Sequence, residues 1–296
     1  MSSALDLVPT LIDVPASQRG EASFRLRYED ITEDGRLSCR AMTNALGATL
    51  WEKVLLTHPS AEPLGRAGIL PILSRVYVSS VGRPIGYGSR PTTRGGFAVM
   101  RARDGKGRAR FRLDMNVAID GKVGHTHPPQ PPNAGESIVL GRVHAEHVLT
   151  RLFAAPSERR VDALPEGVAI DGDTEWREAE VSATPAGEVR WLDADFVPDA
   201  SETVFGLGHT DSNHHVNSLV YPLAIEEAAL RRGAGVTRAS FAHHFELAFR
   251  KPFFAGERMR VELRAYERGD VFGVVARLVD IATSEPRTFG RLELVS

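Results

Sequence analysis

The chain has 296 residues, 42% of them hydrophobic and 25% charged, which is enough for one large globular domain or two smaller ones. Lysine and arginine (36 residues) nearly balance aspartate and glutamate (38), so the net charge of −2 gives no overall field that would attract nucleic acid or an anionic membrane. The single cysteine, Cys39, excludes an intrachain disulfide and a multi-cysteine zinc site. With no targeting segment and no apolar run of the roughly 20 residues that span a membrane, we expect a cytoplasmic protein that binds neither nucleic acid nor membrane.

The first half of the chain has the pattern of strands around one amphipathic helix. Residues 22–29 alternate apolar with polar side chains, which predicts a strand, and residues 38–56 carry apolar side chains at three- and four-residue steps, which predicts a helix. The next segments are rich in Val, Ile, Phe and Tyr, and glycine-containing turns separate them, one at Asp104-Gly105. They predict strands over 68–81, 95–103 and 108–119.

The middle of the chain begins with a proline-rich segment, residues 125–133, which predicts a linker or long loop near the end of the first unit. The apolar spacing after it predicts a helix over 143–153. Two alternating runs, 175–182 and 188–196, predict strands on either side of a turn.

The second half repeats the order of the first. It predicts a strand over 202–207, a helix over 218–232 that ends at Gly233, and four strands, over 240–250, 258–266, 271–279 and 288–294. A strand, a central helix and a run of antiparallel strands, occurring twice, predict an α+β fold made of two copies of one unit. We divide the chain into an N-terminal unit, 1–165, which includes the proline-rich region, and a C-terminal unit, 166–296.

A cluster of polar residues lies directly ahead of the second predicted helix and reads Asp211-x-Asn213-x-His215-Val216-Asn217-x-x-x-Tyr221. A carboxylate, an amide and an imidazole beside the free N–H groups of a helix start are the groups needed to attack a carbonyl and hold the resulting oxyanion. Helix caps and turns use the same residue types. Capping, however, explains neither the histidines nor a tyrosine one helical turn after the last asparagine.

This pattern resembles the one that fatty acyl-ACP thioesterases carry where the second of their two hot-dog units begins, and it differs only at Ser218. Residues 24–29 and the turn that follows them resemble, less specifically, the start of the family's first unit. The resemblance implies two tandem hot-dog units, each an antiparallel sheet wrapped around a long central helix, with the N-terminal unit contributing to acyl binding. It also implies hydrolysis of an acyl thioester, carried by coenzyme A or an acyl carrier protein, to a free acid and a thiol.

The resemblance also implies roles for individual residues. Asp211 would attack the thioester or activate a water, Asn213 would orient it or the substrate, and His215 would polarise or protonate the substrate. Substrate binding would involve Val216, Asn217 and Tyr221. The family carries a further glutamate at the position of Pro252, and Glu246 lies near this position but out of register, so the implied network lacks one member.

Two other functions stay open beside hydrolysis. A non-catalytic protein that binds an acyl thioester would fit the proline in place of the glutamate. A hot-dog enoyl hydratase or dehydratase would carry a proline after the asparagine and a histidine five residues after the aspartate, whereas His214 follows Asn213 here.

The histidines do not form a familiar metal signature. A zinc-binding helix carries His-Glu-x-x-His, and His144-x-x-His147 has a three-residue step instead. His125-x-His127 and the group of His209, Asp211, His214 and His215 do not fit this signature either. We therefore expect no metal and no cofactor.

The expected partner is the substrate, an acyl-ACP or acyl-CoA thioester. An acidic carrier protein would need a basic rim, for which the candidates are Arg231, Arg232, Arg238, Arg250 and Lys251. Because hot-dog units pair to cover their sheets, a double unit is expected to be a monomer or a homodimer.

Overall fold

The computed structural model describes residues 4–10, 13–103 and 107–296. It forms two compact units, Met1–Arg177 (unit 1) and Glu178–Ser296 (unit 2). Each unit consists of one largely antiparallel sheet with a helical segment packed against it. None of the described helices has the length and apolar character needed to cross a membrane.

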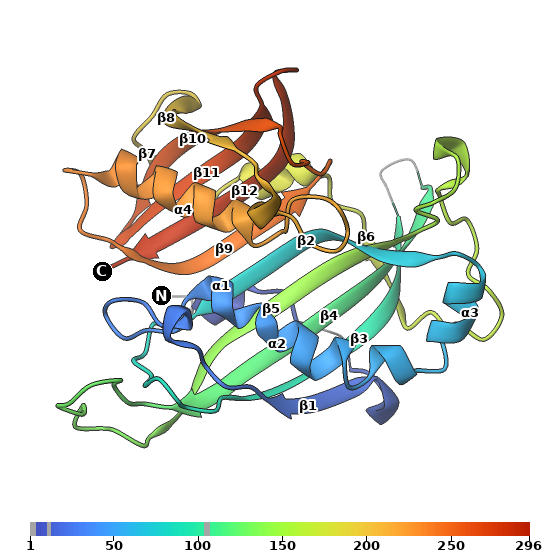
Figure 1. The fold of residues 1–296 in the computed structure, drawn as a ribbon, viewed down its shortest axis with the longest axis horizontal. Helices are drawn as coiled ribbons and strands as arrows, with labels where there is room; N and C mark the ends of the chain where they lie inside the picture. Colours follow the sequence, from blue (N-terminus) through green and yellow to red (C-terminus); the bar gives the residue numbers. More distant parts are fainter. Residues whose placement is uncertain (1–3, 11–12, 104–106) are drawn as a thin grey trace. The chain divides into compact units, whose positions relative to one another are not determined.

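The sheet of unit 1 has the strand order β1-β3-β4-β5-β2, with antiparallel neighbours, and a short sixth strand runs parallel to β3 (Figure 1). Its strands are β1 (Arg19–Ser23), β2 (Leu70–Ser80), β3 (Thr92–Arg103), β4 (Ala109–Lys122), β5 (Ser137–Thr150) and β6 (Gly172–Glu175). β2, β3 and β4 confirm the strands predicted over 68–81, 95–103 and 108–119. The turn predicted at Asp104-Gly105 lies outside the described residues.

Strand β5 shows that the helix predicted over 143–153 is wrong. β5 lies between β4 and β2 in the sheet, and most residues of 143–149, on both faces of the strand, are buried (Figure 1). A strand buried on both faces lacks an apolar–polar alternation, and its apolar residues happened to fall at helical spacing. The proline-rich segment 125–133 connects β4 to β5, so it is a loop inside unit 1 and does not end the unit.

The helix predicted over 38–56 is present but interrupted. Ser38 Oγ caps its start by accepting a hydrogen bond from the Ala41 N–H at 3.2 Å, and Met42 and Leu50 are fully buried. The segment consists of α1 (Cys39–Met42), α2 (Asn44–Leu46), the π-helical turn η4 (Gly47–Trp51) and the 3₁₀ turn η5 (Leu55–Thr57). The other helical elements of unit 1 are η1 (Ala4–Leu7), η2 (Ala16–Gln18), η3 (Tyr28–Asp30), α3 (Ala61–Arg66) and η6 (Pro156–Glu158).

The strand predicted over 22–29 is wrong beyond Ser23, where β1 ends. Arg27 donates to the carboxylate of Asp30 from its main-chain N–H and from its guanidinium, each at 2.8 Å, and Asp30 is buried. This local bonding draws the chain into the turn η3 instead of leaving it extended.

The sheet of unit 2 has the strand order β9-β12-β11-β10-β7, with β8 also paired to β10, and all neighbours are antiparallel. Its strands are β7 (Arg190–Trp191), β8 (Val197–Val204), β9 (Phe241–Phe249), β10 (Arg258–Arg268), β11 (Val271–Asp280) and β12 (Glu285–Val295). The four strands predicted after the second helix are confirmed by β9 to β12. The strand predicted over 202–207 begins earlier and ends at Val204.

Helix α4 (Val220–Gly233) confirms the helix predicted over 218–232 and contacts the sheet of unit 2 (Figure 1). Its buried face includes Tyr221, Ile225 and Ala229. A side chain at Gly233 would meet Phe272, because a Cβ there would lie 3.2 Å from that ring. The last turn of α4 therefore packs close to β11.

Residues 175–196 form little of the strand structure predicted for 175–182 and 188–196. β6 ends at Glu175, β7 has two residues, and a 3₁₀ turn, η7 (Ala179–Ala183), replaces the first predicted strand. Ser182 Oγ donates to Glu246 Oε1 at 2.6 Å, and Arg291 donates to the carbonyl of Thr184 at 3.0 Å. Tertiary hydrogen bonds of this kind hold the segment in place, instead of the main-chain hydrogen bonds that a strand would make with its neighbours.

Candidate active site

Asp211 lies in a tight loop of unit 2, between the turn η8 (Leu207–His209) and helix α4. Thr210 and Val216 pair across the base of the loop. The Asp211 N–H donates to the carbonyl of His215 at 3.2 Å, and the His214 N–H donates to the carbonyl of Asp211 at 3.0 Å. His214 has a φ of 62°, in the left-handed region, which closes the turn. The loop is therefore fixed by its own main chain.

The carboxylate of Asp211 is oriented by two neutral donors. Oδ1 accepts a hydrogen bond from the main-chain N–H of Asn213 at 2.9 Å, and Oδ2 accepts one from Asn217 Nδ2 at 3.1 Å. Asp211 is partly exposed. Because a carboxylate has about four lone-pair positions, these two bonds fix its direction and leave acceptor capacity toward solvent.

Asn213 and His215 lie in the same turn as Asp211. His215 is half-buried, and its Nδ1 lies 3.2 Å from the carbonyl oxygen of Val216. A carbonyl oxygen only accepts, so Nδ1 carries the hydrogen of this bond, and Nε2 is the acceptor of the neutral ring. The Asn213 side chain is exposed. The structure thus brings the three predicted catalytic residues together within one turn.

Asn217 connects the loop to the helix. Its Oδ1 accepts from the Leu219 N–H at 2.8 Å, its carbonyl accepts from the Val220 N–H at 3.0 Å, and its Nδ2 holds Asp211. Asn217 therefore fixes the turn that leads into α4 and is also a partner of the carboxylate. Because the Val220 N–H is occupied by this turn and Pro222 has no N–H, the start of α4 offers an oxyanion fewer donors than the sequence suggested.

Val216 and Tyr221 are buried and both hydrogen-bond to the main chain of Phe253. The Val216 N–H donates to the Phe253 carbonyl at 2.8 Å, and the Phe253 N–H donates to Tyr221 Oη at 3.3 Å. Burial raises the pKa of Tyr221 to about 12, so its phenol is neutral at physiological pH. Phe205 also stacks with Phe253, with ring centres 5.2 Å apart. The sequence did not single out Phe253, although an aromatic pair after a proline was the available signal.

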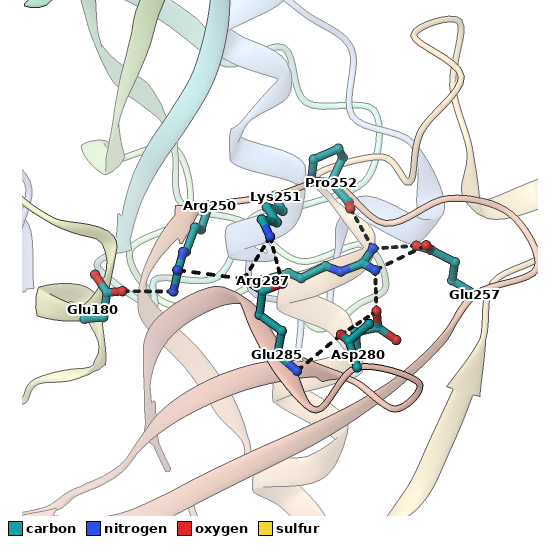
Figure 2. A network of polar contacts seen from close by, with 9 residues as sticks. Glu180, Arg250, Lys251, Pro252, Glu257, Asp280, Glu285 and Arg287 are labelled. Atoms are coloured by element: carbon teal, nitrogen blue, oxygen red, sulfur yellow. Dashed lines mark hydrogen bonds and ion pairs between the residues drawn. The ribbon is translucent and has the colours of Figure 1, made fainter. Parts of the chain in front are cut away.

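The two positions considered for a fourth catalytic residue have other contacts. Glu246 lies on β9, is buried, and accepts from Ser182 at 2.6 Å and from Arg291 at 3.4 Å. The carbonyl of Pro252 accepts from the guanidinium of Arg287 at 3.0 Å, in the network that Figure 2 shows.

A second polar cluster lies in unit 1 and is buried. Arg112 donates to Asp114 at 2.6 Å and lies 2.9 Å from Glu146. Burial raises the pKa of Asp114 to about 6, although the charge of Arg112 opposes this, and burial lowers the pKa of His144 to about 3. A cavity of about 280 Å³ borders all four residues. The histidine is therefore neutral, and the cluster is closely paired.

The prediction of no metal covered the group of His209, Asp211, His214 and His215 as well as the two histidine pairs. His144 and His147 lie on β5, and burial lowers the pKa of His147 to about 4. Across the described ranges, no group of three or more His, Cys, Asp or Glu side chains is placed to hold a metal ion.

The basic residues considered as a rim for a carrier protein are mostly paired with carboxylates. Arg231 donates to Asp199 at 2.6 Å, and Arg232 pairs with Asp193. Two further pairs, Arg250 with Glu180 at 3.3 Å and Lys251 with Glu285 at 2.7 Å, are drawn in Figure 2. Most of their charge is thus compensated within unit 2.

Three solved structures are similar to almost the whole chain. An acyl-ACP thioesterase from Bacteroides thetaiotaomicron is 14% identical, with a TM-score of 0.58, over 93% of this chain and 97% of that one. A 12:0-ACP thioesterase from Umbellularia californica is 14% identical, with a TM-score of 0.59, over 96% and 99%. A protein provisionally described as an oleoyl thioesterase, from Lactobacillus plantarum, is 13% identical, with a TM-score of 0.60, over 95% and 98%.

The chain has the fold of acyl-ACP thioesterases. This thioesterase fold confirms, at the level of architecture, the resemblance predicted from the pattern between Asp211 and Tyr221. No protein-family profile and no curated protein matches the sequence. The assignment of chemistry therefore depends on the residues of the loop.

Proposed function

We propose that this chain is an acyl thioesterase that hydrolyses an acyl thioester to a free acid and a thiol, with Asp211 as nucleophile or general base. The observation that carries the proposal is the Asp211 carboxylate, which two neutral donors orient and which stays accessible. The thioesterase fold supports the proposal, because thioester hydrolysis needs an oriented base or nucleophile, and Asp211, in the loop before α4, is such a group.

In the general-base form of this reaction, Asp211 takes a proton from water while the water oxygen bonds to the thioester carbonyl carbon. The C–S bond then breaks, and the leaving thiolate takes a proton. His215 can supply this proton when its ring is protonated, because Nδ1–H is held by the Val216 carbonyl and Nε2–H is then the free donor. Proton transfer from Asp211 back to His215 restores both groups.

The remaining roles follow from the loop. We propose that Asn213 orients the carboxylate or the substrate and that Asn217, supported from beneath by the buried Val216 and Tyr221, shapes the substrate-binding site. We also propose that the two compact units are tandem hot-dog units, with the first contributing to acyl binding. The substrate is an acyl-ACP or acyl-CoA thioester, and the chemistry requires no cofactor.

Steady-state release of free thiol, measured on panels of acyl-CoA and acyl-ACP, tests the proposal. We expect wild-type protein to release thiol and Asp211→Ala to lose this activity. Equal release by both proteins would overturn the hydrolytic role of Asp211. Tight binding of acyl thioesters without thiol release would instead support the non-catalytic alternative, for which Pro252 is the specific observation.

A further inference from the structure

The segment after β9 is tied to the strands beside it by one arginine. Arg287, on β12, has a side chain that is only 12% exposed, and its guanidinium contacts three groups (Figure 2). Nη1 donates to the carbonyl of Pro252 at 3.0 Å and to Glu257 Oε2 at 2.6 Å. Nη2 donates to Glu257 Oε1 at 3.2 Å and to Asp280. Such forked, charge-assisted bonds are among the strongest hydrogen bonds in proteins, so residues 252–257 are firmly held.

Asp280, the last residue of β11, fixes the position of the Arg287 guanidinium. It is buried and accepts from the Ala282 N–H and from Thr283 Oγ1, each at 2.9 Å. Burial alone would raise the pKa of Asp280, but these bonds and the charge of Arg287 lower it below its usual value. The carboxylate therefore stays ionised and keeps the guanidinium in place.

The held segment in turn holds the loop of Asp211. The peptide of Phe253 bonds Val216 through its carbonyl and Tyr221 through its N–H, at 2.8 and 3.3 Å. The guanidinium carbon of Arg287 also lies 4.6 Å from the centre of the Phe253 ring. A continuous series of contacts thus runs from Arg287 through Phe253 to the residue that precedes Asn217.

We propose that Arg287 is a positioning residue for the Asp211 carboxylate. Asn217 holds Asp211 Oδ2, and Val216 is its neighbour in the chain, so a displacement of the Phe253 peptide moves the donor that aims the carboxylate. Lysine keeps the charge of arginine but lacks the planar fork, and it cannot reproduce the bonds to Pro252, Glu257 and Asp280 together. The kinetic part of this inference rests on the proposed hydrolysis.

The kinetic test compares Arg287→Lys with a matched control, Arg258→Lys, which alters an exposed ion pair between Arg258 on β10 and Glu202 on β8. We expect Arg287→Lys to lower kcat by about 10- to 100-fold, because small misplacements of a reacting group have effects of this size. KM should change by no more than about two-fold, since ground-state binding is kept. The control should keep both constants. A kcat for Arg287→Lys equal to that of the control would overturn the inference.

A double-mutant cycle separates positioning from general weakening of the fold. Tyr221→Phe removes the acceptor of the Phe253 N–H, so its effect on kcat should be smaller in the Arg287→Lys background than in wild type. In the Arg258→Lys background, the effect of Tyr221→Phe should be unchanged. Additive effects in both backgrounds would count against a shared route through Phe253.

Hydrogen exchange tests the same inference without any activity. The Val216 amide should exchange at least about 10-fold faster in Arg287→Lys than in wild type, and it should be unchanged in Arg258→Lys. Unchanged exchange in Arg287→Lys would overturn the positioning role even if the protein is a thioesterase. If Arg287→Lys speeds exchange but the wild-type protein releases no thiol, the link from Arg287 through Phe253 to Val216 is upheld and only the proposed function is refuted.

Discussion

Asp211 and Asp114 are aspartates of the two units with opposite surroundings. Asp211 is partly exposed and accepts from an amide N–H and an asparagine side chain. Asp114 is buried and bonded to Arg112, which also binds Glu146. Both lie near a histidine, so residue type alone does not distinguish them. What differs is the donor: the hydrogen bonds to Asp211 come from neutral groups, whereas Asp114 is paired with a buried cation.

The same contrast applies to the histidines. Burial lowers the pKa of His144 to about 3, so it stays neutral and cannot act as an acid near pH 7. His215 is half-buried, with Nδ1 bonded to a carbonyl and Nε2 available. His144 is therefore held in its neutral form, whereas we propose that His215 exchanges protons with a substrate.

The largest effect on stability should come from unpairing the buried cluster. Arg112→Gln leaves Asp114 and Glu146 without their shared cation, and removing one partner of a buried pair costs about 3–5 kcal/mol. Denaturant unfolding followed by fluorescence will measure the loss. A loss under about 1 kcal/mol, typical of exposed pairs, would show that the cluster is hydrated and would weaken the contrast with Asp211.

The next effect concerns the loop. Asn213→Ala and His215→Ala should each lower kcat by about 10²-fold, the usual size for a lost acid–base or oxyanion partner, with the free energy of unfolding nearly unchanged. Steady-state thiol release and thermal melts of the same samples will check both quantities. Turnover at the wild-type level in both variants would leave Asp211 without its proposed partners.

A smaller effect on both quantities is expected at Asn217, which fixes the turn ahead of α4 and aims the carboxylate. Asn217→Ala should lower the free energy of unfolding by about 1 kcal/mol, through the lost hydrogen bond to Leu219, and kcat by about 10-fold. Asn217→Asp serves as its control, because it keeps the acceptor for the Leu219 N–H but repels the Asp211 carboxylate. A kcat for Asn217→Asp equal to that of wild type would show that the Asn217–Asp211 bond has no part in turnover.

The smallest effect on turnover is expected for Asp114→Asn, whose effect is on the pH dependence of stability. The folded protein binds the Asp114 proton more tightly than the unfolded chain, because the pKa rises from 3.8 to about 6. The contribution to stability is full below about pH 4 and is lost as the pH rises through 6. In the variant, the decrease of the free energy of unfolding with rising pH should be smaller by up to about 1.4 kcal/mol per pH unit, measured by denaturant unfolding between pH 4 and 7. Equal slopes would contradict the burial argument.

The sequence predicted the parts whose partners are close along the chain. Helix α4 and strands β9 to β12 have clear periodicity, and they were predicted to within a few residues. Asp211, Asn213 and His215 share one turn, so their proximity was also readable. Their catalytic roles stay predictions.

The parts that the sequence did not predict depend on distant contacts. β5 has the apolar spacing of a helix because residues on both of its faces are buried, so its apolar and polar residues do not alternate. The segment 175–196 was mistaken for strands because Glu246 and Arg291 hold it from the sheet. The contacts from Arg287 to Phe253 and to Pro252 likewise join distant parts of the chain, so no local sequence pattern predicts them.

The most direct test of the account is thiol release by wild type, Asp211→Asn and Asp114→Asn at equal concentrations of folded protein. Asparagine keeps the size of each side chain and removes its charge. One variant therefore removes the partly exposed carboxylate and the other removes the buried one. We predict that Asp211→Asn lowers kcat by roughly 10³–10⁴-fold, as when an essential group is removed, while Asp114→Asn stays within about two-fold of wild type. Wild-type turnover in Asp211→Asn would contradict the assignment of hydrolysis to this loop.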